Sequence, residues 1–241
     1  MHMLVTRPQP DADAQAARLQ ELGHEATVAP LLEIRFEDMA ARPPDRTQAI
    51  VITSRNALRA MQASAALDSI RDKPLFAVGE ATARLARELG FAKVRAGSGT
   101  AEALAPVLVE HCDPSGGILY HPAGEALAWD LKGALEAKGF EIVQPVVYRA
   151  VAVRKLPENA VAAIQRGMIG GVILMSPETA RTYARCIRDA QLEAQARLLA
   201  YYCLSASVAA QLEPLSRVDV HVPAAVTQDD LLALIGRVTA N

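Results

Sequence analysis

Short apolar runs that end in small polar residues recur along the chain, and a helical pattern follows each one. The run at residues 49–52 reaches the polar cluster 53–56 and then a helix-like stretch to Met61. Unbroken apolar runs are typical of strands buried on both faces, as in parallel sheets. Ser, Thr and Asn are favoured at helix N-termini. The pattern therefore predicts strand, polar turn and helix, and it recurs from Met3, Leu75, Gly117, Gly171 and Leu198.

Three of the predicted helices end at a glycine that precedes another strand-like run: Gly23, Gly90 and Gly139. Glycine is expected just past a helix because it adopts positive φ without strain. The chain thus alternates β and α throughout, which predicts parallel sheets covered by helices.

Two stretches, residues 31–36 and 147–154, alternate apolar and polar positions instead, as half-exposed strands do. They bracket a middle block about as long as the rest of the chain. We interpret them as a two-stranded β-ribbon linker between two α/β domains. Domain 1 would be discontinuous, 1–34 and 153–241, and domain 2 would be the inserted block, 35–152. One continuous sheet would fit the same pattern.

Composition excludes several classes of protein. The 241 residues carry a formal net charge of −2 and no dense Lys/Arg run, which argues against nucleic-acid binding. The apolar runs are far shorter than the roughly 20 residues that cross a bilayer, and we expect no signal peptide. The cysteines are odd in number and widely spaced, which fits neither a disulfide framework nor a zinc motif. We therefore expect a cytoplasmic protein without membrane contact.

The polar turns are candidate binding elements, because ligands of open α/β sheets bind beyond the carboxyl ends of the strands. Helix N-termini there favour anions. Arg7 and Arg55 add guanidinium groups that match carboxylates. If two domains face each other through these turns, the cleft would bind a large ligand rich in negative groups. Alternatively, the Ser, Thr and Asn side chains merely cap helices.

The signatures of metal and nucleotide sites are absent from the sequence. No G-x-G-x-x-G follows a strand, and there is no Walker A loop or nucleophile elbow. The segment 97–99 (Gly-Ser-Gly) is a weak phosphate-loop candidate that fits a simple turn better. The five histidines show no metal-ligand spacing. We therefore expect an enzyme here to need neither metal nor other cofactor.

Tyr148 lies in the second alternating strand, among aliphatic and basic neighbours. At a cleft hinge, its hydroxyl could donate a proton or a hydrogen bond to a ligand. Equally, it could be an amphipathic strand residue with its ring packed and its hydroxyl in water.

Five segments follow one another in a characteristic order and spacing: residues 5–8, 53–57, 78–83, 147–149 and 176–180. In this order and spacing, the chain resembles the uroporphyrinogen-III synthases. The resemblance implies a cofactor-free lyase of tetrapyrrole and heme biosynthesis, with its site in an interdomain cleft. The reaction would cyclise the linear tetrapyrrole hydroxymethylbilane to uroporphyrinogen III. The implied reaction would lose water and invert the last pyrrole ring through a spiro intermediate. We also expect a monomer.

Carried over by position, the resemblance makes Tyr148 the candidate catalytic acid. The implied substrate-binding residues are Thr6, Arg7, Ser54, Arg55, Asn56, Thr82, Ser176 and Ser207. There are departures: His121 stands where family members often have Arg, Leu204 where a glycine turn is common, and Ser207 where Thr is usual. The alternative is therefore a non-catalytic protein of the same fold that binds or responds to an anionic small molecule.

Overall fold

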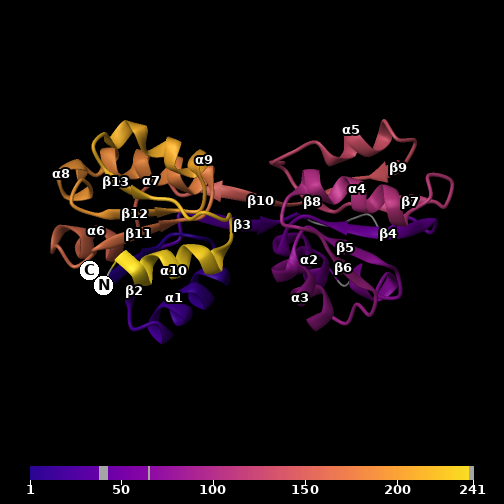
Figure 1. The fold of residues 1–241 in the computed structure, drawn as a ribbon, viewed down its shortest axis with the longest axis horizontal. Coiled ribbons are helices and arrows are strands. Elements are labelled where there is room, and N and C mark those ends of the chain that lie inside the picture. The colour runs from indigo at the N-terminus through magenta and orange to yellow at the C-terminus, as the bar shows by residue number, and fades with distance from the viewer. Residues whose placement is uncertain (38–42, 65, 239–241) are drawn as a thin grey trace. The chain divides into compact units, whose positions relative to one another are not determined.

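The computed structural model describes residues 1–37, 43–64 and 66–238 (Figure 1). The chain divides into two compact units. Unit 1 combines Met1–Glu33 with Val151–Asn241, and unit 2 is Ile34–Ala150. The expected domain bounds, 1–34 with 153–241 and 35–152, lie one or two residues from these limits.

Within the described residues, unit 1 contains a five-stranded parallel sheet in the order β13-β12-β11-β1-β2. The N-terminal strand β1 thus lies inside a sheet whose other half comes from the end of the chain. The strands are β1 His2–Val5, β2 Glu25–Val28, β11 Gly171–Leu174, β12 Ala200–Cys203 and β13 Asp219–His221. The helices are α1 Asp11–Glu21, α6 Glu158–Gln165, α7 Pro177–Asp189, α8 Glu193–Ala196, α9 Ala206–Ala209, η2 Ala210–Leu215 and α10 Gln228–Val238.

Alternate residues of the unit 1 strands enter two separate cores. Met3 and Val5 pack with α1 and α10 on one face. Leu4 packs with α6, α7 and the following helices on the other. Figure 1 shows these two helical layers on either side of the sheet. Burial on both faces is why these strands appear in the sequence as unbroken apolar runs.

Unit 2 has a second five-stranded parallel sheet among its described residues, in the order β6-β5-β4-β7-β9. Helices α2 and α3 pack on one face, and α4 and α5 on the other (Figure 1). The strands are β4 Thr47–Ile52, β5 Leu75–Ala77, β6 Val94–Ala96, β7 Ile118–Tyr120 and β9 Glu141–Val143. The helices are α2 Arg55–Ala63, η1 Ala66–Ser69, α3 Glu80–Glu88, α4 Ala101–His111 and α5 Leu131–Glu136.

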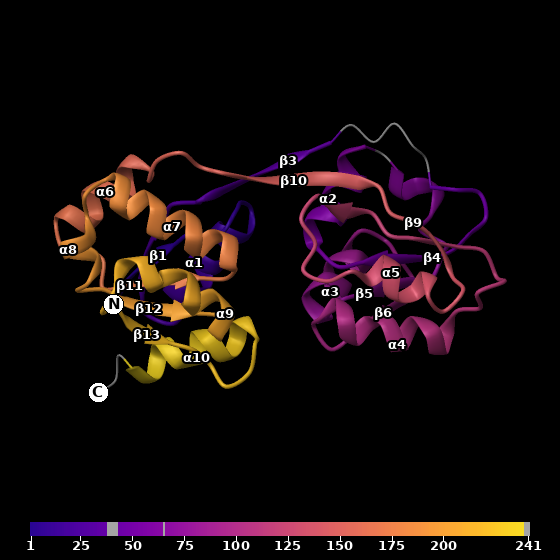
Figure 2. The same ribbon diagram turned by 90° about the horizontal axis from the view of Figure 1, so that it is seen from above.

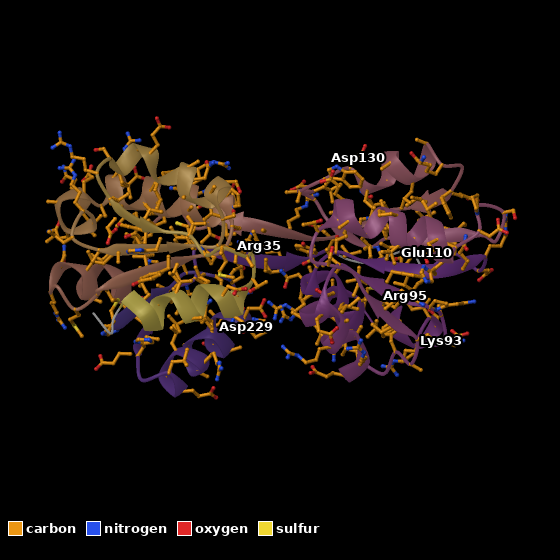
Figure 3. All side chains as sticks on the ribbon, in the orientation of Figure 1. Arg35, Lys93, Arg95, Glu110, Asp130 and Asp229 are labelled. Atoms are coloured by element: carbon orange, nitrogen blue, oxygen red, sulfur yellow. The ribbon has the colours of Figure 1, made fainter. Side chains whose placement is uncertain are left out.

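The edge of the unit 2 sheet at β6 is charged. Lys93 and Arg95 lie there (Figure 3), and both are exposed. Charged side chains on an edge strand discourage pairing with another chain. The short β6 is therefore protected by its own sequence.

The two alternating stretches form β3 (Leu32–Phe36) and β10 (Val146–Ala152), which lie side by side (Figure 2). The backbone N–H of Val153 donates to Leu31 O and that of Glu37 to Val147 O, so the strands run antiparallel. The predicted fold class, two parallel-sheet α/β units joined by a ribbon, is confirmed. The sequence did not predict β8 (Ala123–Gly124), which pairs with β10 in parallel.

Local signals in the sequence have the predicted structural effect. Gly23, Gly90 and Gly139 each follow a helix with φ between +80° and +94°, the left-handed conformation that favours glycine just past a helix end. One predicted strand is shorter than its apolar run. Residues 198–204 yield only β12, because Leu198 lies outside the sheet and is 85% exposed.

We predict that residues 34–150, produced alone, fold cooperatively. Both cores of unit 2 consist of residues from within this continuous segment. Urea unfolding followed by circular dichroism should give a single sigmoidal transition. The matched control is residues 151–241, which lack β1, the neighbour of β11, and should not fold alone. A gradual, non-cooperative transition of the 34–150 fragment would contradict the prediction.

Candidate active site

The two central strands of unit 2, β4 and β7, mark the point where the chain turns in opposite directions. From β4 the chain continues to β5 on one side, and from β7 to β9 on the other. Beyond the carboxyl ends of such strands lies the usual ligand-binding crevice of open α/β sheets. Thr53 and His121 are the first residues after β4 and β7 and lie at this crevice.

A cavity of about 520 Å³ occupies the crevice. Its wall includes Thr53 and Ser54 after β4, His121 after β7, Trp129 before α5, and Tyr148 of β10. The first residues of α4, the turn before it, Val78, Gly124 and residues 126–128 also line the cavity. The volume lies in the range of small-molecule sites. The cavity combines an indole, a phenol and several hydroxyl groups, and can therefore hold a ligand that is both aromatic and polar.

The Tyr148 ring lies against Gly124. The two residues pair between β10 and β8. A side-chain Cβ at position 124 would lie 2.6 Å from Tyr148 Cζ and 2.7 Å from its hydroxyl oxygen. Only glycine leaves room for the ring in this position. Among the described residues, the hydroxyl has no hydrogen-bond partner, so it is available to a ligand in the cavity.

His121 is buried, with 2% of its surface exposed, and bridges the two central strands. Its Nε2 lies 3.1 Å from Thr53 Oγ1, and its Nδ1 lies 3.1 Å from Gln144 Oε1. Burial lowers the pKa of the imidazole to about 4, although the hydrogen bond to Gln144 acts in the opposite direction. The ring is therefore neutral at pH 7 and brings no positive charge to the cavity.

The turn after β4 holds three sequence-predicted residues. Ser54 lines the cavity and caps α2 by accepting a hydrogen bond from the Asn56 backbone N–H. Arg55 and Asn56 follow in the first turn of α2. The Asn56 side chain accepts a hydrogen bond from Arg59. Ser54 therefore caps a helix and faces the cavity, so the two interpretations of the polar turns do not exclude each other.

Thr82 lies in the first turn of α3 and is 6% exposed. Its backbone N–H donates to Gly79 O. Gly79 follows β5, as Ser54 follows β4. Thr82 is at the predicted edge of the sheet, but it is not among the residues that line the cavity in the described part of the chain.

The remaining predicted residues lie in unit 1. Thr6 and Ser176 follow β1 and β11, the switch point of that sheet. Thr6 is fully buried and its hydroxyl donates to Ile173 O at 2.7 Å, holding β1 against β11. Ser176 caps α7, accepting from the Thr179 N–H, and its hydroxyl lies 2.8 Å from that of Thr179.

Arg7 and Ser207 also have protein partners. Arg7 is mostly buried and binds Asp11 Oδ2 at 3.2 Å and Gln228 Oε1 at 2.8 Å, so its charge is matched within unit 1. The Ser207 hydroxyl is exposed and lies 2.9 Å from that of Ser205. Leu204 does not prevent the next helix, because α9 begins at Ala206 directly after it and Ser205.

Apart from Ser54 and Tyr148, the cavity residues were not predicted as site residues; those with polar or aromatic side chains include Thr53, His121 and Trp129. Thr53 and His121 directly follow apolar runs, and this position after a predicted strand could have identified them as site residues. Trp129 is the chain's single tryptophan, but nothing in its local pattern places it at a strand end. The segment 97–99 forms a turn whose backbone hydrogen-bonds to Ala77 and Val78 before Thr100 caps α4.

A family profile described as uroporphyrinogen-III synthase HemD matches residues 13–233, most of the chain. The chain belongs to the uroporphyrinogen-III synthase family. The uroporphyrinogen-III synthetase of Helicobacter pylori has a similar structure, with a TM-score of 0.65 at 16% identity and 98% coverage of each chain. A mutant uroporphyrinogen III synthase of Thermus thermophilus has a TM-score of 0.56 at 16% identity, covering 99% of this chain and 97% of that one. No curated protein sequence matches the chain.

Membership of the synthase family confirms the resemblance seen in the sequence. It identifies the chain as an enzyme of porphyrin biosynthesis, a cyclising lyase, in preference to a non-catalytic binding protein. The two structures, at their low identity, establish the shared fold. Across the described residues, no helix is long and apolar enough to span a membrane, and no group of side chains is arranged to bind a metal.

We predict that the free energy of unfolding depends on pH through the titration of His121. Its pKa is about 4 in the folded state and 6.5 ordinarily. Well above pH 6.5, the His121 imidazole is neutral in both the folded and the unfolded chain and does not affect the free energy of unfolding. As pH falls from 6.5 to 4, the unfolded chain binds a proton that the folded chain does not. The free energy of unfolding should therefore fall by up to about 3 kcal/mol from this group.

Urea unfolding at pH 7.0, 5.5 and 4.5 checks this expectation when wild type is compared with His121→Gln. The variant lacks the titrating ring, and the two polar partners of position 121, Thr53 and Gln144, are uncharged. Its stability should fall less steeply with acidification. Parallel pH profiles would show that His121 does not titrate as proposed.

Proposed function

We propose that the chain cyclises hydroxymethylbilane to uroporphyrinogen III, and that the cavity of unit 2 holds the reacting end of this substrate. The observation that carries the proposal is the Tyr148 hydroxyl, available in the wall of the switch-point cavity. Trp129 and Leu127 offer apolar surface to the face of a pyrrole ring. The family assignment supports the same substrate class, a tetrapyrrole.

Tyr148 would act as the acid in the first step. The bond between the hydroxymethyl carbon and its oxygen breaks, and the electron pair leaves with the oxygen. Transfer of the phenol proton to this oxygen turns the departing group into water and leaves Tyr148 as a phenolate. The pyrrole nitrogen supplies electrons to the carbon left behind. The last ring attacks this carbon through its α-carbon that bears the methylene link to the third ring, which gives the spiro intermediate. The bond from that α-carbon to the link then breaks, and the methylene of the link bonds to the free α-carbon of the same ring. Loss of the proton from this second α-carbon restores the aromatic ring and the phenol.

The carboxylate arms of the substrate would bind at helix N-termini. Helices α2 and α4 both begin beside the cavity, and their first backbone N–H groups carry partial positive charge. Ser54, Arg55 and Asn56 belong to the first of these sites. Since His121 is neutral, the dipoles of the two helices and the guanidinium group of Arg55 would supply the attraction.

The other predicted residues remain proposed substrate contacts, but some of them already bind protein groups. Thr82, Ser176 and Ser207 lie at the starts of the helices that follow β5, β11 and β12, and have hydroxyl groups that can accept as well as donate. Thr6 would act indirectly, because its hydroxyl already donates to Ile173 O. Arg7 would have to share its charge with Asp11.

We also propose that the two units act as domains, that the enzyme is a monomer, and that it works in the cytoplasm without a cofactor. The three cysteines, Cys112, Cys186 and Cys203, support a reducing compartment because each is a free thiol. The chemistry of the first step supports the absence of a cofactor, since it needs only a proton donor and an electron-rich pyrrole.

An isomer assay tests the proposed activity. Purified protein receives freshly made hydroxymethylbilane, the products are oxidised, and the porphyrin isomers are separated. Type III porphyrin above the level of a protein-free control supports the proposal. Type I alone, the product of spontaneous ring closure, would refute it.

For Tyr148→Phe, we predict a folded protein whose rate of type III formation is about tenfold to a few hundredfold lower. The change removes the hydroxyl and keeps the ring that packs against Gly124. Positioned acids contribute about 10²- to 10⁴-fold, and spontaneous cyclisation favours the low end. Single-turnover rates and thermal denaturation of the variant and wild type provide the measurement.

Tyr120→Phe is the matched control for this variant. Tyr120 lies in β7, in the core against which Tyr148 packs, with 1% of its surface exposed, and its buried hydroxyl has no partner among the described residues. Its loss should leave both turnover and stability unchanged or slightly improve stability. Full activity of Tyr148→Phe would assign Tyr148 to packing and leave the acid to be sought elsewhere.

The two arginines should behave differently. Arg55→Ala should raise KM a few fold with kcat nearly unchanged, because it would remove uniform binding of a carboxylate arm. Arg7→Ala should also lower the melting temperature, since it breaks the contacts to Asp11 and Gln228 that join the turn after β1 to the starts of α1 and α10. Steady-state kinetics and thermal denaturation check both. A large fall in kcat for Arg55→Ala at constant KM would refute its binding role.

A further inference from the structure

The side chains of Thr53 and His121 form a hydrogen-bonded pair in the cavity wall, one from each central strand. The pair is 68 residues apart in sequence. His121 is almost fully buried, whereas Thr53 is partly exposed and faces the cavity. Gln144 holds the other side of the imidazole. The three side chains form a chain of hydrogen bonds that ends at the Thr53 hydroxyl.

The chemistry of this chain fixes the direction of each hydrogen bond. Gln144 Oε1 can only accept, so His121 Nδ1 carries the proton. The ring is neutral, because burial holds its pKa at about 4. Nε2 is therefore an unprotonated acceptor, and the Thr53 hydroxyl must donate to it. Because the Thr53 hydroxyl donates its hydrogen to His121, the Thr53 oxygen can only accept hydrogen bonds from a ligand in the cavity.

We propose that His121 is a positioning residue that fixes Thr53 as a hydrogen-bond acceptor for a pyrrole N–H group of the substrate. This inference rests on the proposed function, because the pyrrole belongs to hydroxymethylbilane. An acceptor at Thr53 excludes a carboxylate arm from this point, since a carboxylate is itself only an acceptor. The ring edge of the substrate binds there, and the arms bind at the helix N-termini.

The acceptor also assists the reaction. When the hydroxyl group leaves, positive charge spreads onto the pyrrole nitrogen, and its N–H becomes a stronger donor. A hydrogen bond to Thr53 therefore strengthens as the carbon–oxygen bond breaks, and contacts that strengthen in the transition state raise kcat. Tyr148 would donate to the leaving oxygen, and Thr53 would accept from the N–H of the pyrrole ring that loses it. Both lie in the wall of one cavity.

The first test is spectroscopic and does not need substrate. Nitrogen-15 NMR of histidine-labelled protein distinguishes the two neutral tautomers. We expect His121 to carry its proton on Nδ1, and Thr53→Val to shift the Nε2 resonance because its donor is lost. A proton on Nε2, or no shift of that resonance in Thr53→Val, would overturn the inference.

The second test is kinetic. Thr53→Val should lower kcat for type III formation about threefold to tenfold, the effect of one ordinary hydrogen bond. Thr53→Ser restores the hydroxyl and should recover most of the rate. His121→Asn cannot reach Thr53 with an acceptor and should resemble Thr53→Val. His121→Gln places an amide oxygen near the Nε2 position and should recover most of the rate.

Thr47→Val is the matched control. Thr47 lies at the other end of β4, is 3% exposed, and donates a hydrogen bond to Pro44 O at 2.6 Å. Its variant should lose stability as Thr53→Val does while keeping full kcat. Equal losses of kcat in the two valine variants would show a structural effect and overturn the inference.

The outcomes separate this inference from the proposed function. If wild type forms type III porphyrin and Thr53→Val retains full kcat, the synthase activity stands and the pyrrole contact is wrong. If wild type forms only type I porphyrin, the proposed function is wrong. The pyrrole contact is then wrong as well, regardless of which His121 tautomer NMR shows.

Discussion

Parallel backbone pairing is the constraint on which the candidate site depends. Because all five strands of the unit 2 sheet run in one direction, every polar turn that leads into a helix emerges at the same edge. The opposite turns of the chain after β4 and β7 then leave a crevice between the connections. Thr53 and His121 meet there although they are far apart in sequence. The same arrangement brings Thr6 to β11 in unit 1, but there the hydroxyl is used inside the sheet.

The cavity wall is closer to neutral than a site for an anionic ligand would suggest. His121 is uncharged at pH 7, and Glu102 places an exposed carboxylate at the start of α4. Attraction for carboxylates therefore depends on the backbone N–H groups of the cavity wall together with Arg55 in the first turn of α2, each of which contributes modestly. A ligand with many carboxylates can accumulate such contacts, whereas a ligand with one cannot. The selectivity of the site would then come from the number and spacing of charges, more than from any single ion pair.

Properties encoded locally could be predicted from the sequence. The apolar runs gave the buried strands, and Gly23, Gly90 and Gly139 gave the helix ends. Tertiary relations could not be predicted in the same way. In sequence, Thr6 and Thr53 look alike, since each follows an apolar run, yet one hydroxyl binds a backbone carbonyl and the other faces a cavity. The pairing of β8 with β10 was also missed, because two residues are too short to show a pattern.

The central position of β1 has a consequence for synthesis of the chain. Thr6 donates to Ile173, 167 residues further along, and β1 pairs with the strand that contains Ile173. At roughly 5–20 residues per second, this partner leaves the ribosome about 10–30 s after β1. All of unit 2 emerges in that interval. During this interval, β1 therefore has one edge without its partner strand, and another chain can pair with that edge. The length of the inserted segment determines how long a nascent chain needs protection by chaperones.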